Sequence, residues 1–405
     1  MVGEMMDLTI PPEVAELRDL VTAFVRDTVI PAEPRDQGGH GPDEALRTEL
    51  QDAARAAGVF APHVAPELGG LGLDHRGQAA VFEAAGYSLL GPLALNCAAP
   101  DEGNIHMLAK IADPEQRQRY LRPLAAGEIR SCFAMTEPAP GAGSDPSMLR
   151  TEAVPVDGGW SISGRKWFIT GAEGAAFTIC MARTAERIER GRGATMFVVD
   201  ADNPGMRIER IIDAMDRSFP GGHAEVVFED CHVGADAVLG VVGQGYDHAQ
   251  VRLAPARLTH CMRWLGIADR SLDIALDRAT EREAFGSKLG QLGQVQQMIA
   301  DSVIDIETSR LLIWKCASVL DGGGSGHAES SIAKAHIGDA VYRVVDRAIQ
   351  ICGSLAVSAD VPLARYLNEV RPFRIYDGPT ETHRWAIGRR AIRHRAKVTG
   401  AAEAV

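Results

Sequence analysis

The chain has 405 residues, 46% hydrophobic and 24% charged, so it is long enough for two or three domains and a substantial buried core. Its formal net charge of −12 argues against a nucleic-acid partner, because phosphate binding needs clustered Lys and Arg. The one basic cluster, residues 384–397, is interpreted as the solvated face of a last helix.

Cysteine spacing and hydropathy indicate the redox environment and the cellular compartment of the protein. Its seven cysteines show no CxxC pairing, which favours reduced thiols over a disulfide framework or a zinc site, and we expect no metal. Residues 1–7 carry acidic side chains and lack the apolar core of a leader peptide. No apolar run is long enough to span a bilayer, so we expect a cytoplasmic protein without a membrane span.

The first part of the chain has helical periodicity. Between Pro11 and about Leu124, apolar residues recur at spacings of three and four, for example Val14, Leu17, Leu20 and Val21. Short loops with Gly and Pro separate these segments. The sequence predicts an all-helical N-terminal domain over residues 1–130.

Residues 131–240 have a different character. Short runs rich in β-branched and aromatic residues, punctuated by turn residues, are typical of closely spaced strands. The runs are 160–163, 166–170, 177–181, 195–199 and 224–228. Since no helical segment separates them, they predict an antiparallel sheet, and we expect it to close as a β-barrel domain.

The helical period returns after the glycine run 239–245 and continues almost to the end. This run is spaced in the reverse order from a dinucleotide-binding fingerprint and lacks a βαβ context, so we interpret it as an interdomain turn. Helices are predicted over about 246–280, 291–320, 328–354 and 381–397. They form a four-helix-bundle domain over residues 241–405, and the fold class is α+β.

A candidate general base lies in the stretch from Arg374 to His383. Asp377 stands between an apolar aromatic run and a Gly-Pro turn, where a carboxylate would be presented from a backbone corner. Apolar neighbours would raise its pKa towards the working pH, as suits a general base. Asp-Gly-Pro is also ordinary turn chemistry, so this motif alone does not decide between the two interpretations.

Several motifs together resemble the acyl-CoA dehydrogenase family over nearly the whole chain. Met135-Thr-Glu-Pro138 with Gly143-Ser-Asp145 is similar to the first family signature, and Lys166-Trp-Phe-Ile-Thr-Gly171 to the strand beside the flavin. Arg282-Glu-Ala-Phe-Gly286 and Gln350-Ile-Cys-Gly353 resemble the elements that hold the FAD pyrophosphate and adenosine, partly from a neighbouring subunit.

The resemblance is greatest to the branch of acyl-CoA dehydrogenase family members ten and eleven. It rests on residues 96–104, on Gly221-Gly-His223 and on Asp377-Gly-Pro-x-Glu381. Most of the family has Glu where Asp377 stands here. Some relatives carry the base on the helix that opens the last domain, but alignment on Arg257 puts Ala256 at that position, which leaves Asp377.

The resemblance implies removal of the α-proton of an acyl-CoA thioester while a hydride leaves the β-carbon for flavin N5. Asp377 would take the proton, its own amide would bind the thioester oxygen, and Arg257 would favour the carboxylate. The implied substrate contacts are Ser144, Arg257, Tyr376 and Gly378. The implied FAD contacts are Phe133, Met135, Thr136, Ser144, Phe168, Thr170, Arg282, Phe285, Leu292, Gln350, Gly353, Ser354, Pro379, Thr380 and Glu381.

Four features depart from the family pattern. Two extra residues lie between Pro138 and Gly143, and Ser354 replaces a second glycine. Pro379 and Glu381 stand where Thr and Gln are common. The departures put in question the shape of the 138–143 loop and the contacts of these side chains with FAD.

Three functions stay open at this point. The first is an FAD-dependent acyl-CoA dehydrogenase in fatty acid β-oxidation, a homodimer or homotetramer that passes electrons to an electron-transferring flavoprotein. The second is a flavin oxidase on the same scaffold, acting on acyl-CoA or on nitroalkanes, since nitroalkane oxidases of this superfamily also use an aspartate base. The third is a non-catalytic flavin-binding scaffold.

Overall fold

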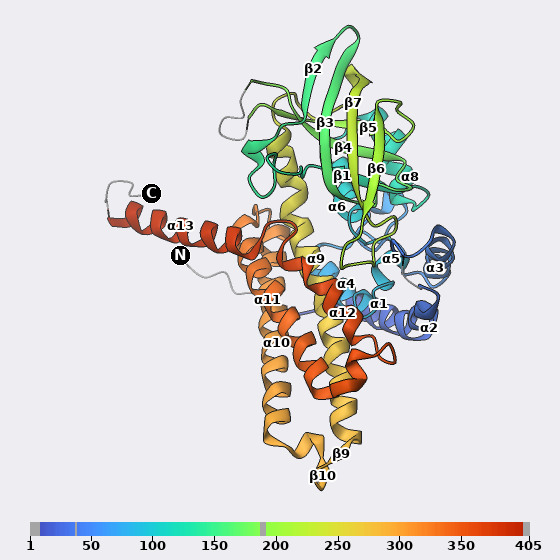
Figure 1. The fold of residues 1–405 in the computed structure, drawn as a ribbon, viewed down its shortest axis with the longest axis vertical. Coiled ribbons are helices and arrows are strands. Elements are labelled where there is room, and N and C mark those ends of the chain that lie inside the picture. Colours follow the sequence, from blue (N-terminus) through green and yellow to red (C-terminus); the bar gives the residue numbers. More distant parts are fainter. Residues whose placement is uncertain (1–8, 37–38, 187–191, 400–405) are drawn as a thin grey trace. The chain divides into compact units, whose positions relative to one another are not determined.

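The computed structural model describes residues 9–36, 39–186 and 192–399, and it divides into two compact units (Figure 1). The sheet unit comprises Arg26–Leu73 and Pro92–Ala256, and the helical unit comprises Met1–Val25, Asp74–Gly91 and Arg257–Val405. The expectation about a leader at residues 1–7 lies outside the described residues.

The sheet unit is built on eight strands, drawn mostly in green in Figure 1. They are β1 (Ser131–Ala134), β2 (Glu152–Val156), β3 (Gly159–Thr170), β4 (Phe177–Arg183), β5 (Ala194–Asp200), β6 (Met206–Ile212), β7 (His223–Gly234) and β8 (Val238–Leu239). The path is β6-β7-β3-β2-β4-β5-β8, and β1 pairs in parallel with β4 off this path.

The expected closed antiparallel barrel is wrong, because this sheet is open and mixed. The path ends on β6 at one side and on β8 at the other. Strand β8 has only two residues, and β6 presents exposed Arg207, Glu209 and Arg210, so both end strands are of the kind that resists further pairing. The expected strand positions are confirmed, with 160–163 and 166–170 merged in β3.

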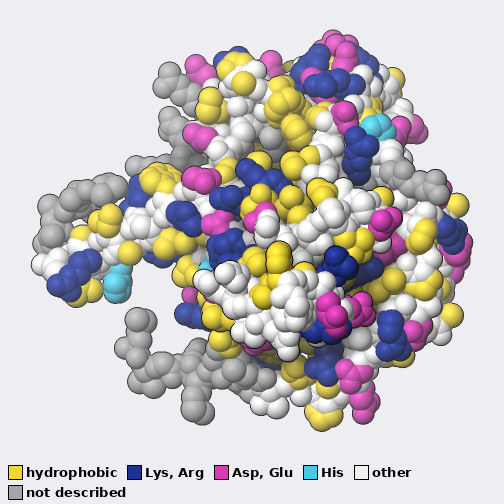
Figure 2. All heavy atoms as spheres, turned by 60° about the horizontal axis from the view of Figure 1, so that its bottom comes forward, with side chains coloured by type: hydrophobic (Ala, Val, Ile, Leu, Met, Phe, Trp, Pro, Cys, Tyr) yellow, Lys and Arg dark blue, Asp and Glu magenta, His cyan; other side chains and the backbone are white. Residues whose placement is uncertain are grey.

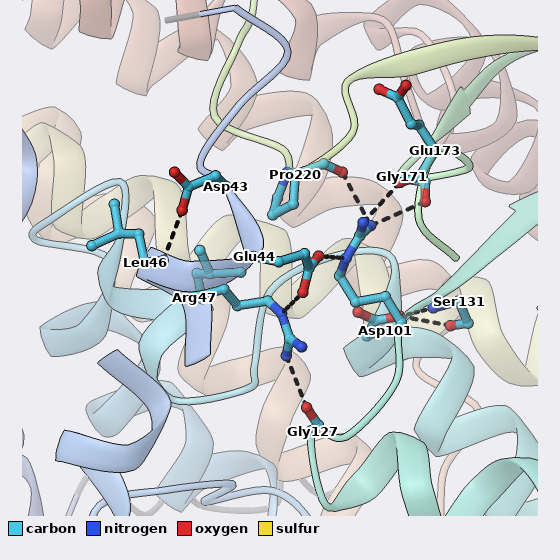
Figure 3. Close-up of polar contacts among 12 residues, drawn as sticks. Asp43, Glu44, Leu46, Arg47, Asp101, Gly127, Ser131, Gly171, Glu173 and Pro220 are labelled. Carbon is cyan, nitrogen blue, oxygen red and sulfur yellow. Dashed lines mark hydrogen bonds and ion pairs between the residues drawn. The ribbon is translucent and has the colours of Figure 1, made fainter. Parts of the chain in front are cut away.

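Two of the helices in the sheet unit, α3 (Glu44–Ala56) and α7 (Pro114–Gln116), begin at capping aspartates. The others are α2 (Ile30–Ala32), α5 (Gly91–Ala94, across the unit boundary), α6 (Asp101–Ile111) and α8 (Arg122–Ala125). The Asp43 carboxylate accepts the Leu46 amide at the start of α3 (Figure 3), and Asp113 forms a capping box with Gln116.

Arg130 joins the loops that flank β3 and β7. Its guanidinium pairs with Glu44 and donates to the carbonyl oxygens of Gly171 (3.1 Å), Glu173 (2.7 Å) and Pro220 (3.3 Å). Figure 3 shows these three carbonyls converging. Since a guanidinium has a fixed fork of donors, it holds the end of β3 and the start of β7 in one arrangement.

The helical unit contains long helices with short connections. They are α1 (Pro12–Phe24), α4 (His75–Ala85), α9 (Gly245–Glu281, of which the part from Arg257 belongs here), α10 (Gly293–Asp321), α11 (His327–Cys352), α12 (Leu363–Val370) and α13 (Thr380–Thr399). A hairpin of β9 (Glu283–Ala284) and β10 (Ser287–Lys288) joins α9 to α10. The four helices expected after residue 245 are confirmed, and α12 was not predicted.

Helices α10 and α11 lie side by side and antiparallel (Figure 1). Asp305, close to the middle of α10, pairs with Arg343 and Arg347 in the second half of α11. The five-residue connection 322–326 makes this the expected arrangement.

Helix α13 carries the basic cluster mostly on exposed positions, mixed with the exposed apolar residues Trp385, Ile392 and Val398. Figure 2 shows this mixture of basic and hydrophobic side chains along the helix. Among the described residues, no helix combines the length and the apolar character that a membrane crossing requires. All seven cysteines are buried.

A buried ion pair fixes the loop that follows β1. Lys166 Nζ lies 2.9 Å from Glu137 Oε1, and the two side chains are 0% and 2% exposed. The Glu137 carboxylate also accepts the amides of Ala142, Arg150 and Thr151. Burial alone would raise the pKa of Glu137, but Lys166 and these donors hold it below its ordinary value. One carboxylate therefore gathers both ends of the loop 137–151.

Replacing Lys166 by Met should destabilise the sheet unit by roughly 3–5 kcal/mol, because the Glu137 charge would stay buried without its cation. Urea unfolding followed by tryptophan fluorescence measures the change. Arg207→Met removes an exposed partner of Glu229 and should leave the unfolding midpoint almost unchanged. Equal effects of the two substitutions would contradict this account of the loop.

Candidate active site

The predicted site residues fall into groups on the two units, and each group is described within its own unit. In the sheet unit, Met135 and Thr136 follow β1 and meet β3 through backbone contacts. Trp167 N donates to Thr136 O (3.0 Å), and Lys166 Nζ donates to Met135 O (3.1 Å). Phe133 lies under the guanidinium of Arg252, 4.4 Å from the ring centroid. The structure thus brings the predicted residues of both motifs together.

Strand β3 is irregular where it carries Phe168. Its register against β7 shifts between Lys166 and Ile169, and Phe168 has a φ of +52°. An aromatic residue rarely adopts this left-handed conformation, so the position is strained. The ring is 45% exposed and meets Trp167 edge-on. The irregularity turns an aromatic surface outward beside Thr136.

Thr170, at the end of β3, is the first member of a polar chain. Its Oγ1 lies 3.0 Å from Nδ1 of His223, the residue opposite it on β7. His223 Nε2 lies 3.1 Å from Asp216 Oδ2, and both residues are buried. Gly171 N donates to Gly222 O (2.8 Å), which fixes the backbone beside this chain.

Ser144 lies on the exposed part of the loop that Glu137 holds. The neighbouring Asp145 carboxylate accepts the amide and the hydroxyl of Ser147 (2.9 and 2.7 Å). The loop therefore has defined local structure at its tip, with the Ser144 side chain accessible.

In the helical unit, Asp377 occupies a sharp backbone corner. Its φ is +53°, and that of Gly378 is +102°. A Cβ on Gly378 would lie 2.7 Å from the His383 ring, so this position requires glycine. The Asp377 carbonyl accepts Arg257 Nε (2.8 Å) and lies 3.2 Å from His383 Nε2. Both contacts fix the corner through its backbone.

The carboxylate of Asp377 lies against a buried imidazole. His260 Nε2 is 3.4 Å from Asp377 Oδ2, one turn along α9 from Arg257. Around them, the rings of His260, Phe373 and Tyr376 lie 5.0–6.0 Å apart, and Tyr376 OH accepts Trp264 Nε1 (2.6 Å). Aromatic rings thus surround the imidazole that lies against the predicted base.

Lys334 of α11 is buried beneath this corner. Its ammonium donates to the carbonyls of Phe373 and Gly378, the latter at 3.1 Å, and lies 4.7 Å from the Phe373 ring centroid. Burial lowers the pKa of Lys334 to about 8. Burial also lowers the pKa of His383, to about 4, so this ring is neutral near pH 7. One cation therefore joins the two ends of the turn 373–378.

The residues that begin α13 differ in exposure. Thr380 is buried, and its hydroxyl donates to Arg374 O (3.4 Å). Glu381 is exposed and Pro379 is half-buried.

The remaining predicted cofactor residues of the helical unit lie around the far end of α9 and the end of α11. Arg282 is exposed just after this helix, and Phe285 is 95% exposed at the tip of the hairpin. Leu292 is half-buried before α10, whereas Gln350, Gly353 and Ser354 are exposed at the end of α11. From Arg257 to Arg282 the helical rise amounts to roughly 37 Å. These residues form a second group within the unit.

Three family models match the chain in order. They describe the N-terminal domain (residues 11–128), the middle domain (132–231) and the C-terminal domain (243–392) of acyl-CoA dehydrogenases. The chain belongs to the acyl-CoA dehydrogenase family. The predicted enzyme class, an oxidoreductase acting on a CH–CH bond, is confirmed.

Curated relatives in this family include acyl-CoA dehydrogenase family member 10 of Mus musculus, 35% identical over 96% of this chain. The chain spans 38% of the length of that relative. The probable acyl-CoA dehydrogenase FadE2 of Mycobacterium tuberculosis is 36% identical over 98% of this chain and 99% of its own length. The predicted similarity to family members ten and eleven is thereby confirmed.

Solved structures of the same fold include a putative acyl-CoA dehydrogenase from Mycobacterium abscessus. It is 35% identical with a TM-score of 0.89, over 96% of this chain and 100% of that one. Butyryl-CoA dehydrogenase from Megasphaera elsdenii is 27% identical with a TM-score of 0.86, over the same shares of the two chains. An FAD complex of PigA, 24% identical over 95% of this chain and 99% of that one, has the same fold with a TM-score of 0.86.

Several residues at the two groups were not predicted from the sequence. His260 follows Arg257 by three positions on a helix, a spacing that places both on one face. Lys334 lies within the apolar run Ile332-Ala-Lys-Ala335, where an uncompensated charge was a usable signal. His223 was noted as part of a motif, but Thr170 becomes its neighbour only through strand pairing, and Asp216 only through the course of the β6–β7 connection.

The stability of the helical unit should depend on the titration of Lys334. Its folded-state pKa of about 8 lies below the ordinary 10.5, so the unfolded chain binds more protons between these values. The penalty for the buried charge is complete below pH 8 and disappears as the pH rises to 10.5. The unfolding free energy, taken relative to Lys334→Met, should therefore rise by roughly 3 kcal/mol over this window. Urea unfolding of both proteins at several pH values tests this, and parallel curves would contradict it.

Proposed function

We propose that this protein oxidises an acyl-CoA to the trans-2-enoyl-CoA, with Asp377 removing the α-proton. The observation that carries the proposal is the Asp377 corner, where a half-buried carboxylate stands on a left-handed backbone among aromatic rings. The backbone contacts of this corner hold the carboxylate in one place, as suits a group that accepts a proton from carbon.

The cofactor is FAD, which supplies the acceptor for the hydride that leaves the β-carbon. The residues present fit this group. Phe168 presents an exposed aromatic ring in a strained conformation, as suits a site that a planar ring system covers. Thr136, which follows β1, and Thr170 at the end of β3 would offer hydroxyls to the isoalloxazine edge. Met135 and Phe133 would add apolar surface.

The backbone contacts around Asp377 position the proposed base. Aspartate is one methylene shorter than the glutamate common in the family, and a misplacement of about 1 Å can cost on the order of 100-fold in rate. Lys334, Arg257 and His383 hold the corner through its carbonyls. The carboxylate is then positioned by its backbone, and the Asp377 amide would bind the thioester oxygen as its charge develops.

The proposed substrates are acyl-CoAs of medium to long chain. Tyr376 and Gly378 flank the base and would contact the acyl group, with Arg257 beside them. Ser144, exposed on the loop that Glu137 fixes, would contact the CoA arm or the FAD phosphates. Such a reaction belongs to fatty acid β-oxidation, with an electron-transferring flavoprotein as the electron acceptor.

We further propose that a second copy of the chain completes each FAD site. Roughly 37 Å of helix separates Arg257 from Arg282, so one chain does not bring its hairpin to an isoalloxazine ring at its own Asp377. A wholly exposed Phe285 beside Arg282 offers stacking surface and a permanent cation to the cofactor of a partner. The assembly would be a homodimer or a homotetramer.

Asp377→Asn should keep FAD and lose flavin reduction by about 100- to 10,000-fold, because the amide cannot take the proton. The rate of anaerobic bleaching after addition of acyl-CoAs of graded length measures this effect. Asp360→Asn makes the same chemical change at an exposed position and should reduce at the wild-type rate.

Other outcomes of this experiment point elsewhere. An active Asp377→Asn variant would remove Asp377 from its role. A wild-type flavin that no acyl-CoA bleaches would overturn the dehydrogenase function. Peroxide formed in proportion to substrate loss in air would indicate an oxidase.

Arg282→Gln should weaken FAD binding by about 10- to 100-fold, since a hydrogen bond to a charged group contributes roughly 1.5–3 kcal/mol. The 450 nm absorbance retained after dialysis against dilute FAD measures this loss. Arg395→Gln, an exposed substitution on α13, serves as the control. Equal retention by the two variants would place the FAD phosphates elsewhere.

A further inference from the structure

The chain Thr170–His223–Asp216 lies beside the predicted flavin contacts, and no role in the proposed reaction accounts for its last two members. His223 and Asp216 are 7% and 6% exposed. The imidazole lies between the rings of Phe168 and Phe219, with centroids 5.9 and 5.5 Å away. The Thr170 hydroxyl is thus followed by the buried imidazole of His223 and then by the buried carboxylate of Asp216.

The direction of each hydrogen bond follows from the donor inventory. An ionised Asp216 only accepts, so the His223 Nε2 that lies 3.1 Å away carries the hydrogen. In a neutral imidazole the other nitrogen is then bare, and Nδ1 accepts. The hydroxyl of Thr170, 3.0 Å from Nδ1, must donate its only hydrogen to it. What Thr170 presents away from His223 is therefore a lone pair.

The surroundings hold this geometry in place. Thr170 and His223 are paired across β3 and β7, and Gly171 N donates to Gly222 O beside them. Arg130 joins the carbonyls of Gly171 and Pro220, one from each side of the pair (Figure 3). The backbones that carry Thr170 and His223 are therefore held at a fixed separation.

We propose that His223 and Asp216 are positioning residues that fix Thr170 as a hydrogen-bond acceptor towards the flavin, and that this favours the reduced cofactor. Two ring nitrogens of isoalloxazine carry only lone pairs when oxidised and gain hydrogen on reduction. An acceptor beside such a nitrogen is repelled by the oxidised form and bonds to the reduced form. This inference rests on the proposed function for the placement of the flavin at Thr170.

The test is the flavin midpoint potential of the FAD-loaded enzyme, measured by reductive titration against a reference dye without acyl-CoA. Asp216→Asn removes the preference of the His223 ring for hydrogen on Nε2. The Thr170 hydroxyl is then able to donate its hydrogen to the flavin. The ratio of reduced to oxidised flavin at a fixed solution potential should fall about tenfold, a shift of about −30 mV for a two-electron couple.

The sign of the shift separates this account from simple electrostatics. Loss of a negative charge near the flavin would by itself favour the more electron-rich reduced form and raise the potential. A rise, or no change, in Asp216→Asn would therefore overturn the proposal. His223→Phe, which keeps a ring between Phe168 and Phe219, should also lower the potential.

A double-substitution cycle tests whether the effect passes through Thr170. Thr170→Val keeps the shape and lacks the hydroxyl, so Asp216→Asn should no longer move the potential in that background. An equal shift in both backgrounds would overturn the proposed role of Thr170. Nitrogen-15 shifts of the His223 ring give a direct readout, with hydrogen expected on Nε2 and a bare Nδ1. The opposite tautomer would also overturn it.

Failure of this inference differs from failure of the proposed function. If acyl-CoA reduces the flavin but Asp216→Asn leaves the potential unchanged, only the inference fails. If no acyl-CoA reduces the flavin, the proposed function fails, whereas the dye titration still measures the effect of the three residues on the potential.

Discussion

A buried ammonium group underlies the candidate site in the helical unit. Lys334 has lost most of its hydration and regains part of it from two backbone carbonyls and the face of Phe373. A lysine is tolerated in such a position only while those partners stay in place. The contact therefore works in both directions, since the turn solvates the cation and the cation fixes the turn that presents Asp377.

The sheet unit uses the same principle with different groups. Lys166 and Glu137 hold the loop after β1, and Arg130 holds the loops at the ends of β3 and β7. In both cases a charged side chain that is largely withdrawn from solvent organises backbone rather than substrate. The predicted flavin contacts lie in the segments that these side chains fix. Thr136 stands between Arg130 and Glu137 in the sequence, and Phe168 and Thr170 stand between Lys166 and Gly171.

Local patterns predicted most of this organisation because they record local physics. The strands β3, β4, β5 and β7 follow from runs of β-branched and aromatic residues, and the long helices follow from their period. Asp377 stands between aromatic residues and a Gly-Pro turn, a motif that ordinary turn chemistry also explains, so the resemblance to the family was needed to single it out. Sheet closure could not be predicted, since it depends on whether the end strands β6 and β8 meet. The chain of Thr170, His223 and Asp216 depends on the register of strands 53 residues apart.

The left-handed backbone at Asp377 also explains the choice of acid. Aspartate and asparagine tolerate positive φ far better than residues with longer side chains, because their short polar groups relieve the local crowding. A glutamate here would extend the carboxylate by one methylene and at the same time disfavour the corner that aims it. Backbone shape and side-chain length are thus a matched pair, and an evolutionary exchange of one acid for the other requires the turn to be rebuilt with it.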